Sequence, residues 1–141
     1  DFDTERGYLM VKRVWKAGDL LDWVMDMEPH FIQADRRVYY NAGKAALVRG
    51  PLVYCMEEAD NGSCLHECRV DAAGDIREKW EKDMGGYCSL FIAGVRYRGR
   101  IQEKLYDRLA VQKEDVCLKA VPYFLWNNRG QGEMVTWVNV V

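Results

Sequence analysis

The chain has 141 residues, of which 49% are hydrophobic, and a formal net charge of −2 at pH 7. This length is enough for one hydrophobic core and short for two, so we expect residues 1–141 to form a single domain. The sequence pI of about 5.7 argues against nucleic-acid binding. No apolar run approaches the roughly 20 residues of a membrane helix, so we expect neither nucleic acid nor membrane as a partner.

The first predicted element is a hairpin. Residues from Leu21 to Met27 alternate apolar and mostly polar side chains, the period of a half-buried strand. Turn residues at Ala17-Gly18-Asp19 precede them, which predicts that the segments around Leu9 and Trp23 pair. The acidic start, Asp1 to Arg6, lacks the pattern of a signal peptide, and we expect a cytoplasmic protein.

Short strands with turn residues between them are predicted through the first half of the chain. Asn41-Ala42-Gly43 and Gly50-Pro51 supply the turn chemistry, and Pro51 belongs at an edge, a bulge or a strand start. The predicted strands are Phe31 to Ala34, Arg37 to Tyr40, Ala45 to Arg49, and Leu52 to Glu57.

The second half has a weaker pattern. Ile76 to Asp83 fits an exposed strand or a single helical turn, and Gly99 to Glu114 fits an amphipathic helix, with Ile101, Leu105 and Leu109 on one face, or a long irregular loop. The other expectations are a polar loop from Glu58 to Ser63, a short strand from His66 to Val70, a turn from Asp71 to Asp75, a long buried strand from Tyr87 to Tyr97, and paired closing strands from Val116 to Trp126 and Met134 to Val141. Many short strands with frequent turns predict an all-β, jelly-roll-like antiparallel β-sandwich.

The five cysteines do not form the even, regularly spaced set of a disulfide framework. Cys55, Cys88 and Cys117 lie in apolar runs, where a thiol usually acts as a small buried hydrophobe. Cys64 and Cys68 flank His66 and Glu67, all zinc-ligand types, but a second paired half is missing. We therefore favour a surface loop with free thiols over a metal site, and expect no metal or cofactor in this chain.

The segment from Pro122 to Met134 is the most distinctive. Its aromatic strand leads into Asn and Gly residues, which tolerate positive φ, and the chain then returns as a strand, which predicts a hairpin with an elaborate tip. We expect Arg129 to donate hydrogen bonds to backbone carbonyls or to Glu133, and Gly130 and Gly132 to adopt conformations costly for residues with a Cβ. The candidate residues of this structural or domain-interface loop are Trp126, Asn127, Asn128, Arg129, Gly130, Gly132 and Glu133.

Three phrases carry a family resemblance: Gly7-Tyr8-Leu9 with Trp15 to Asp19, Lys44 to Glu57, and Tyr123 to Met134. Together they resemble the C-terminal region of the bacterial cysteine-dependent β-L-arabinofuranosidases, which are several times longer. The resemblance implies a β-sandwich that follows a catalytic helical toroid, with the cysteine nucleophile, zinc and acid/base all in that toroid. It implies no catalytic, cofactor-binding or metal-binding residue in this chain, and as partner the toroid of the parent chain or a second subunit.

Three classes of function compete. A non-catalytic structural module is favoured, because Trp23, Trp126 and Trp137 lie in predicted strands and only Trp15 and Trp80 in polar settings. The alternative is a carbohydrate-binding module, since five Trp and eight Tyr could stack on sugar rings. An isolated enzyme is the remote third class, because His30 and His66 have no partner at a recognisable catalytic spacing.

Overall fold

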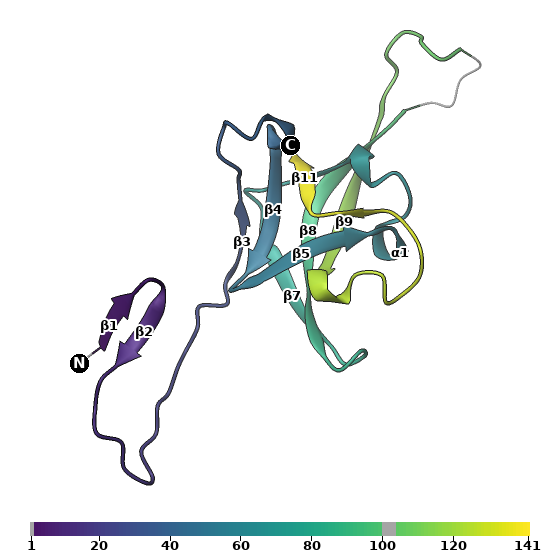
Figure 1. Ribbon diagram of the computed structural model, residues 1–141. Helices are drawn as coiled ribbons and strands as arrows, with labels where there is room; N and C mark the ends of the chain where they lie inside the picture. The colour runs from purple at the N-terminus through teal and green to yellow at the C-terminus, as the bar shows by residue number, and fades with distance from the viewer. Residues whose placement is uncertain (1, 100–103) are drawn as a thin grey trace.

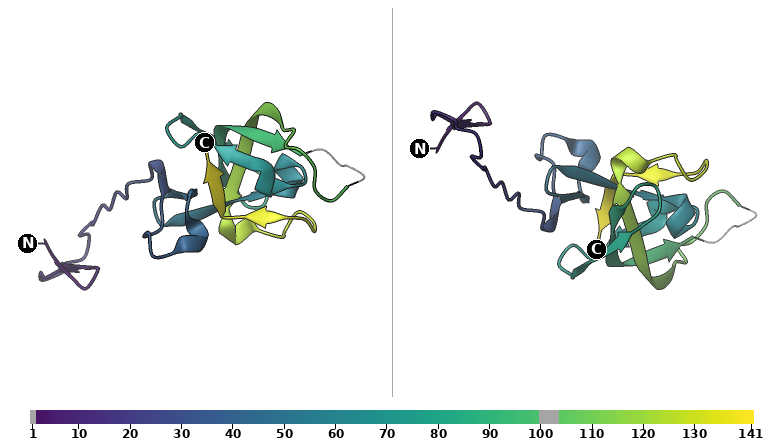
Figure 2. Two further views of the ribbon diagram at one scale, coloured as in Figure 1. Left: turned by 90° about the horizontal axis from the view of Figure 1, so that it is seen from above. Right: turned by 90° about the horizontal axis from the view of Figure 1, so that it is seen from below.

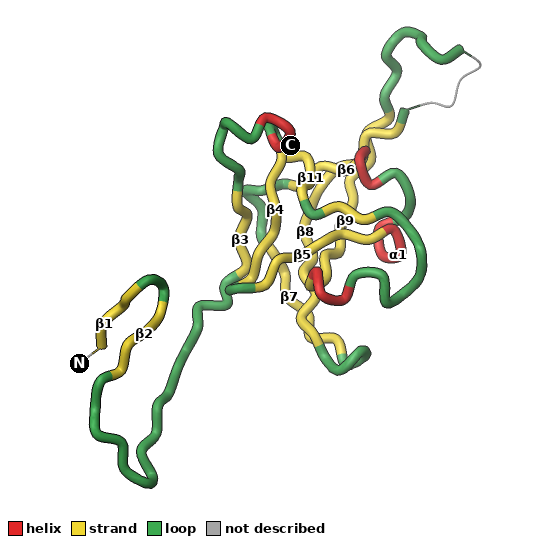
Figure 3. Tube along the Cα trace, in the orientation of Figure 1, coloured by secondary structure: helices red, strands yellow, loops and turns green. Residues whose placement is uncertain are grey.

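The computed structural model describes residues 2–99 and 104–141, and strands dominate this part of the chain. Nine of its strands join in one sheet, and two more form a separate hairpin near the N-terminus. The prediction of an all-β fold is confirmed (Figure 3). The strands of the large sheet are β3 (Pro29–Ile32), β4 (Lys44–Arg49), β5 (Leu52–Glu57), β6 (Cys68–Val70), β7 (Ile76–Glu81), β8 (Tyr87–Arg98), β9 (Gln112–Pro122), β10 (Met134–Val135) and β11 (Trp137–Val140).

The large sheet curls and closes on itself (Figure 1). From β4 the pairing runs through β11, β6, β8, β9 and β5, and β5 returns to β4 at Val48 and Arg49. The ladders are antiparallel, except that β6 and β11 run parallel. The two layers of the predicted sandwich are therefore parts of one barrel-like sheet, which β3, β7 and β10 extend.

The core lies inside this curled sheet, and a smaller apolar cluster lies on its outer side. Side chains alternate across a strand, so Tyr54 and Met56 of β5 enter the main core while Cys55 between them points outward. Cys55 packs there with Tyr87, Val121 and Leu125. Part of β5 is thus buried on both faces, which requires a cover over its outer face.

The short helices in the described residues are η1 (Tyr39–Asn41), α1 (Glu58–Asn61), η2 (Leu65–Glu67) and η3 (Tyr123–Leu125). The last of these contributes Leu125 to the outer cluster. The predicted strand over residues 37–40 is wrong, because this segment forms a turn and η1, and the predicted polar loop over residues 58–63 contains α1.

The N-terminal segment up to residue 25 stands apart from the barrel (Figure 2), and Asp26 and Met27 then lie against Gly50 at the β4–β5 turn. Its strands β1 (Phe2–Glu5) and β2 (Tyr8–Val11) pair with each other. The predicted pairing of the segments around Leu9 and Trp23 is wrong, since residues 12–28 contain neither helix nor strand. Residues 21–27, despite their alternation, join no sheet among the residues that the structure describes.

The two closing strands do not pair with each other either. β9 and β10 lie on opposite sides of β5, and β11 pairs with β4 and β6. The predicted hairpin is therefore wrong, and the connection from η3 to β10 passes from one side of β5 to the other. Trp23 and Trp126, expected in strands, lie outside them and are exposed, whereas Trp137 is half-buried in β11.

Several other predictions are confirmed. The strands predicted over residues 45–49, 52–57 and 87–97 correspond to β4, β5 and β8, and residues 76–83 adopt the strand alternative as β7. Residues 104–111 are irregular, and Leu105 and Leu109 are exposed. Ile101, the third residue of the alternative helix, lies outside the described residues.

No helix in the described part of the chain has the length and apolar character needed to cross a bilayer.

Gly94 lies where the backbones of β8 and β6 come very close together, and substitution there tests this contact. A Cβ at this position would overlap the carbonyl oxygen of Arg69 on β6 and come within 3.0 Å of Leu118 Cδ1. We expect Gly94→Ala to lower the free energy of unfolding by about 1–3 kcal/mol, the usual cost of overpacking. Chemical denaturation measures this change.

The matched control is Gly99→Ala, because a Cβ at Gly99 meets no heavy atom of the described residues within 4 Å. It should change stability by no more than about 0.5 kcal/mol. Equal effects of the two substitutions would contradict the tight β6–β8 contact.

Candidate functional site

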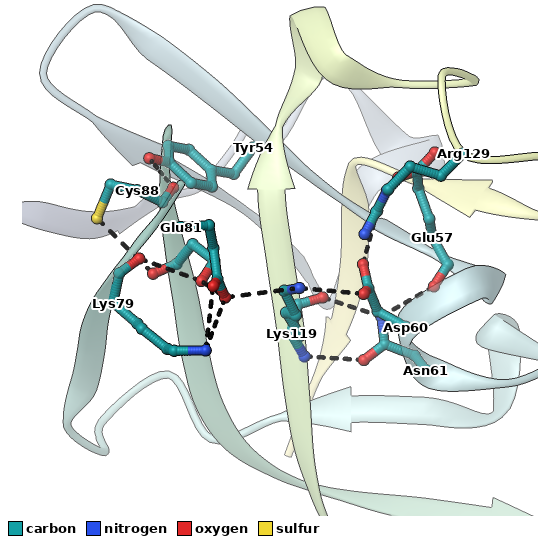
Figure 4. A network of polar contacts seen from close by, with 10 residues as sticks. Tyr54, Glu57, Asp60, Asn61, Lys79, Glu81, Cys88, Lys119 and Arg129 are labelled. Carbon is teal, nitrogen blue, oxygen red and sulfur yellow. Dashed lines mark hydrogen bonds and ion pairs between the residues drawn. The ribbon is translucent and has the colours of Figure 1, made fainter. Parts of the chain in front are cut away.

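The predicted loop, residues 127–133, is held to the barrel by Arg129 (Figure 4). The guanidinium Nη2 donates to Glu57 Oε2 at the end of β5 and lies 2.6 Å from Asp60 Oδ2 of α1. Glu57 is 5% exposed, and its other oxygen accepts the backbone N–H of Asn127 at 3.1 Å. The prediction that Arg129 binds backbone carbonyls or Glu133 is wrong, because two distant carboxylates take that place.

The electrostatics of this cluster follow from its geometry. Burial opposes the charge of Arg129, but its contacts with the carboxylates of Asp60 and Glu57 outweigh this effect and raise the pKa of the guanidinium. The guanidinium thus contacts two carboxylates in a largely buried setting, where an unpaired charge would be strongly destabilising. We call Arg129, Glu57 and Asp60 the Arg129 clamp.

The clamp continues across the sheet through further ion pairs (Figure 4). Lys119 of β9 lies 3.2 Å from Asp60 Oδ1 and 3.8 Å from Glu81 Oε1 of β7. Lys79 Nζ lies 3.0 Å from Glu81 Oε2. This contact is the main cause of the lowered pKa of Glu81, and the hydrogen bond from Ser89 contributes less. The loop, α1, β9 and β7 are thereby linked through polar contacts.

Asn61 fixes α1 onto β9 within the same region. Its Nδ2 donates to the backbone oxygens of Glu57 at 3.0 Å and Lys119 at 2.9 Å, and its Oδ1 accepts from Lys119 N at 2.8 Å. The amide side chain thus bonds both the backbone N–H and the backbone C=O of Lys119 and holds α1 against β9.

Glu133 ties the far end of the loop to the barrel. Its carboxylate accepts the backbone N–H groups of Leu65 at 2.8 Å and Cys64 at 3.1 Å, and these bonds lower its pKa. Its own backbone exchanges bonds with Glu58: Glu133 N donates to Glu58 Oε2, and Glu58 N donates to Glu133 O, both at 2.9 Å. The loop is anchored at both ends.

The remaining candidate residues shape the loop. Asn127 has φ +64° and Gly130 has φ +131°, so both lie where few side chains are comfortable. Gly132 does not have a positive φ, but a Cβ there would come within 3.1 Å of the Glu58 side chain. Asn128 Nδ2 donates to Leu125 O at 3.1 Å, and the Trp126 ring lies 5.8 Å from that of Tyr123.

Cys64 and Cys68 are separated by the fold. Cys64 lies before η2, whereas Cys68 is buried in β6, so the expected loop position of Cys68 is wrong. The Cys68 sulfur accepts from Arg96 Nε at 3.3 Å and Nη2 at 3.2 Å, and the same Nη2 donates to Asn61 O at 2.5 Å. Among the described residues, no three His, Cys, Asp or Glu side chains gather in a metal-binding arrangement. Of the other cysteines, Cys55 is buried, Cys88 is half-buried and Cys117 is exposed.

We expect Arg129→Ala to lower the free energy of unfolding by roughly 1–3 kcal/mol, because it leaves buried carboxylate oxygens without their donor. Chemical denaturation at pH 7 measures the loss. The matched control is Arg98→Ala, which removes an ion pair with Glu114 whose side chains are both 53% exposed. That surface pair should contribute at most about 1 kcal/mol, and an Arg129 effect no larger than the control would reduce the clamp to a surface contact.

The lowered pKa of Glu133 predicts acid sensitivity. Its folded pKa lies below the ordinary value of 4.5, so its stabilising contribution is complete above that value and is lost as the pH falls through the folded pKa. Glu133→Gln should therefore reduce stability at pH 7 and flatten its decline below about pH 4.5. Denaturation from pH 7 to pH 2.5 tests this, and an unchanged acid decline in the variant would contradict it, with Glu114→Gln as the exposed control.

Known proteins are similar to this chain in sequence and in fold. Residues 29–139 match the model of the "Glycoside hydrolase family 127 C-terminal domain". A non-reducing end β-L-arabinofuranosidase of Bifidobacterium longum subsp. longum is 35% identical over 136 residues, covering 90% of this chain and 20% of that protein.

Solved structures agree. A GH127 β-L-arabinofuranosidase from Geobacillus stearothermophilus T6 matches with a TM-score of 0.76 and 37% identity over 82% of this chain and 18% of its own. A GH127 β-arabinofuranosidase matches all of this chain and 22% of its own, with a TM-score of 0.83 and 28% identity. The chain thus spans about a fifth of the length of these relatives. It belongs to glycoside hydrolase family 127, whose C-terminal domain it contains.

Proposed function

We propose that this chain is the non-catalytic C-terminal region of a β-L-arabinofuranosidase-like glycoside hydrolase and packs against a catalytic helical domain in the same polypeptide. The relatives support the parent activity, since those whose activity is named are arabinofuranosidases about five times as long. Zinc and the cysteine nucleophile then belong to that other domain.

The observation that carries the non-catalytic role is the use of the charged residues in the clamp. General acid/base catalysis needs a carboxyl group that can reach the substrate and exchange its proton. Glu57 and Asp60 instead share Arg129, and Glu81 is held by Lys79, Lys119 and Ser89. These carboxylates hold segments of the fold together.

The cysteines give a second line of support. Burial, with a smaller contribution from Glu57, raises the pKa of Cys55 to about 12. Burial and the contact with Glu78 also raise the pKa of Cys88. Both remain neutral thiols near pH 7, whereas a cysteine nucleophile acts as the thiolate.

The contact with the catalytic domain is proposed at the 127–133 loop and the adjoining η3. The loop is anchored at both ends, so it offers a fixed surface. Beside it, Phe124 and Trp126 are 63% and 44% exposed. Exposed aromatic side chains next to a rigid polar loop suit a domain interface.

An activity comparison tests the proposal. The 141-residue chain and its full-length parent are each incubated with an aryl β-L-arabinofuranoside, with and without added zinc. We expect turnover by the parent and none by the chain alone. Turnover by the chain that thiol alkylation abolishes would contradict the non-catalytic role, and a parent inactive on this substrate but active on another glycoside would contradict the assigned sugar.

A further inference from the structure

Residues 20–27 have the sequence pattern of a strand but pair with no strand in residues 2–99 and 104–141. Leu21, Trp23, Met25 and Met27 alternate with Asp22, Val24 and Asp26. The structure assigns no strand here, and Leu21, Trp23 and Met25 are 48%, 63% and 54% exposed. A succession of large apolar side chains open to solvent indicates a surface that another element covers.

The neighbouring β1–β2 hairpin also lacks a further strand partner among the described strands. A two-stranded hairpin alone is marginally stable in water, yet β1 and β2 pair only with each other, and Tyr8 and Met10 of β2 are exposed. Leu9 of β2 and residues 21–24 line a common hollow of about 270 Å³. The hairpin and residues 21–24 therefore lie close together, away from the barrel (Figures 1 and 2), whereas Met27 lies against Gly50 at the β4–β5 turn.

The comparisons separate this segment from the domain that follows. The family's C-terminal domain model begins at residue 29, directly at β3. Two solved relatives nevertheless match the whole chain, with TM-scores of 0.83 and 0.82, and the match takes up only 22% and 24% of them. The N-terminal segment thus belongs to the family's structure but lies outside its C-terminal domain.

We infer that residues 20–27 form a strand, beside the β1–β2 hairpin, in a sheet completed by the part of the parent polypeptide upstream of this chain. The inference rests on the proposed function in that the chain is part of a longer enzyme. Strand addition suits this sequence because residues 20–27 contain no proline, so every backbone N–H can join a ladder. The period of two then places Leu21, Trp23 and Met25 on one face, against an apolar layer of the upstream region.

Hydrogen exchange measured by mass spectrometry tests the inference on the 141-residue chain and on its full-length parent. We expect the amides of residues 20–27 to exchange at least about tenfold more slowly in the parent than in the chain alone. Amides of β8 serve as the internal reference and should be protected in both proteins. Equally fast exchange of residues 20–27 in both would overturn the inference.

Substitutions in the parent test the side-chain face. Met25→Asp should remove the protection of residues 20–27, while Val24→Asp, on the opposite face and 93% exposed, should leave it intact. Trp23→Phe should also keep it, which guards against a general folding defect. Equal effects of Met25→Asp and Val24→Asp would contradict a strand with one covered face.

The oligomeric state of the 141-residue chain shows whether a second copy, and not the upstream region, covers residues 20–27. If the 141-residue chain alone protects residues 20–27 as its concentration rises, and sedimentation shows a dimer, a second copy covers the segment and the inference is wrong. Exchange does not depend on catalysis, so a parent inactive on arabinofuranosides would overturn the proposed activity without affecting this result.

Discussion

The buried carboxylate of Glu57 imposes the constraint on which the cover over the outer face of β5 depends. Glu57 lies at the end of β5, where its backbone pairs with Met134 of β10. Its side chain is almost fully buried. A buried carboxylate must be balanced by a cation and hydrogen bonds. Arg129 and the Asn127 N–H supply both, so the path of the chain from η3 to β10 is fixed by the charge at the end of β5.

This constraint explains why a polar loop adjoins an apolar cluster. Cys55, Val121 and Leu125 bury the outer face of β5 and β9, and the loop must cross β5 to reach β10 on its other side. The clamp holds the loop at one end and Glu133 at the other. The charged residues of the clamp and Glu133 are thus used to hold a strand crossover.

The sequence predicts elements whose signals are local. The hairpin of β4 and β5 combines apolar runs with a Gly50-Pro51 turn, in which Gly50 has φ +55°, and β8 is a long apolar run. The failures involve distant partners. Arg129 and Glu57 are 72 residues apart, and no local spacing indicates that pair. Local spacing also does not indicate that β9 and β10 pair with β5 and not with each other. Nor does it indicate that the Cys68 sulfur accepts hydrogen bonds from Arg96.

Residues 21–27 show a different limit. Their period of two is a real strand pattern, but a strand forms only where another offers its backbone hydrogen bonds. The pattern predicts a strand, but the described part of the chain supplies no neighbouring strand for these residues. The exposure of Trp23, expected in a core, follows from the same cause.

The most direct test of the account is a double-mutant cycle on Arg129 and Glu57, with unfolding free energies of Arg129→Ala, Glu57→Gln and the double variant. If the pair fixes the crossover, the two substitutions will be non-additive, with a coupling energy of about 1 kcal/mol or more, as for residues in one network. Additivity within about 0.3–0.5 kcal/mol, as found for independent sites, would show that the 127–133 loop is held by other contacts.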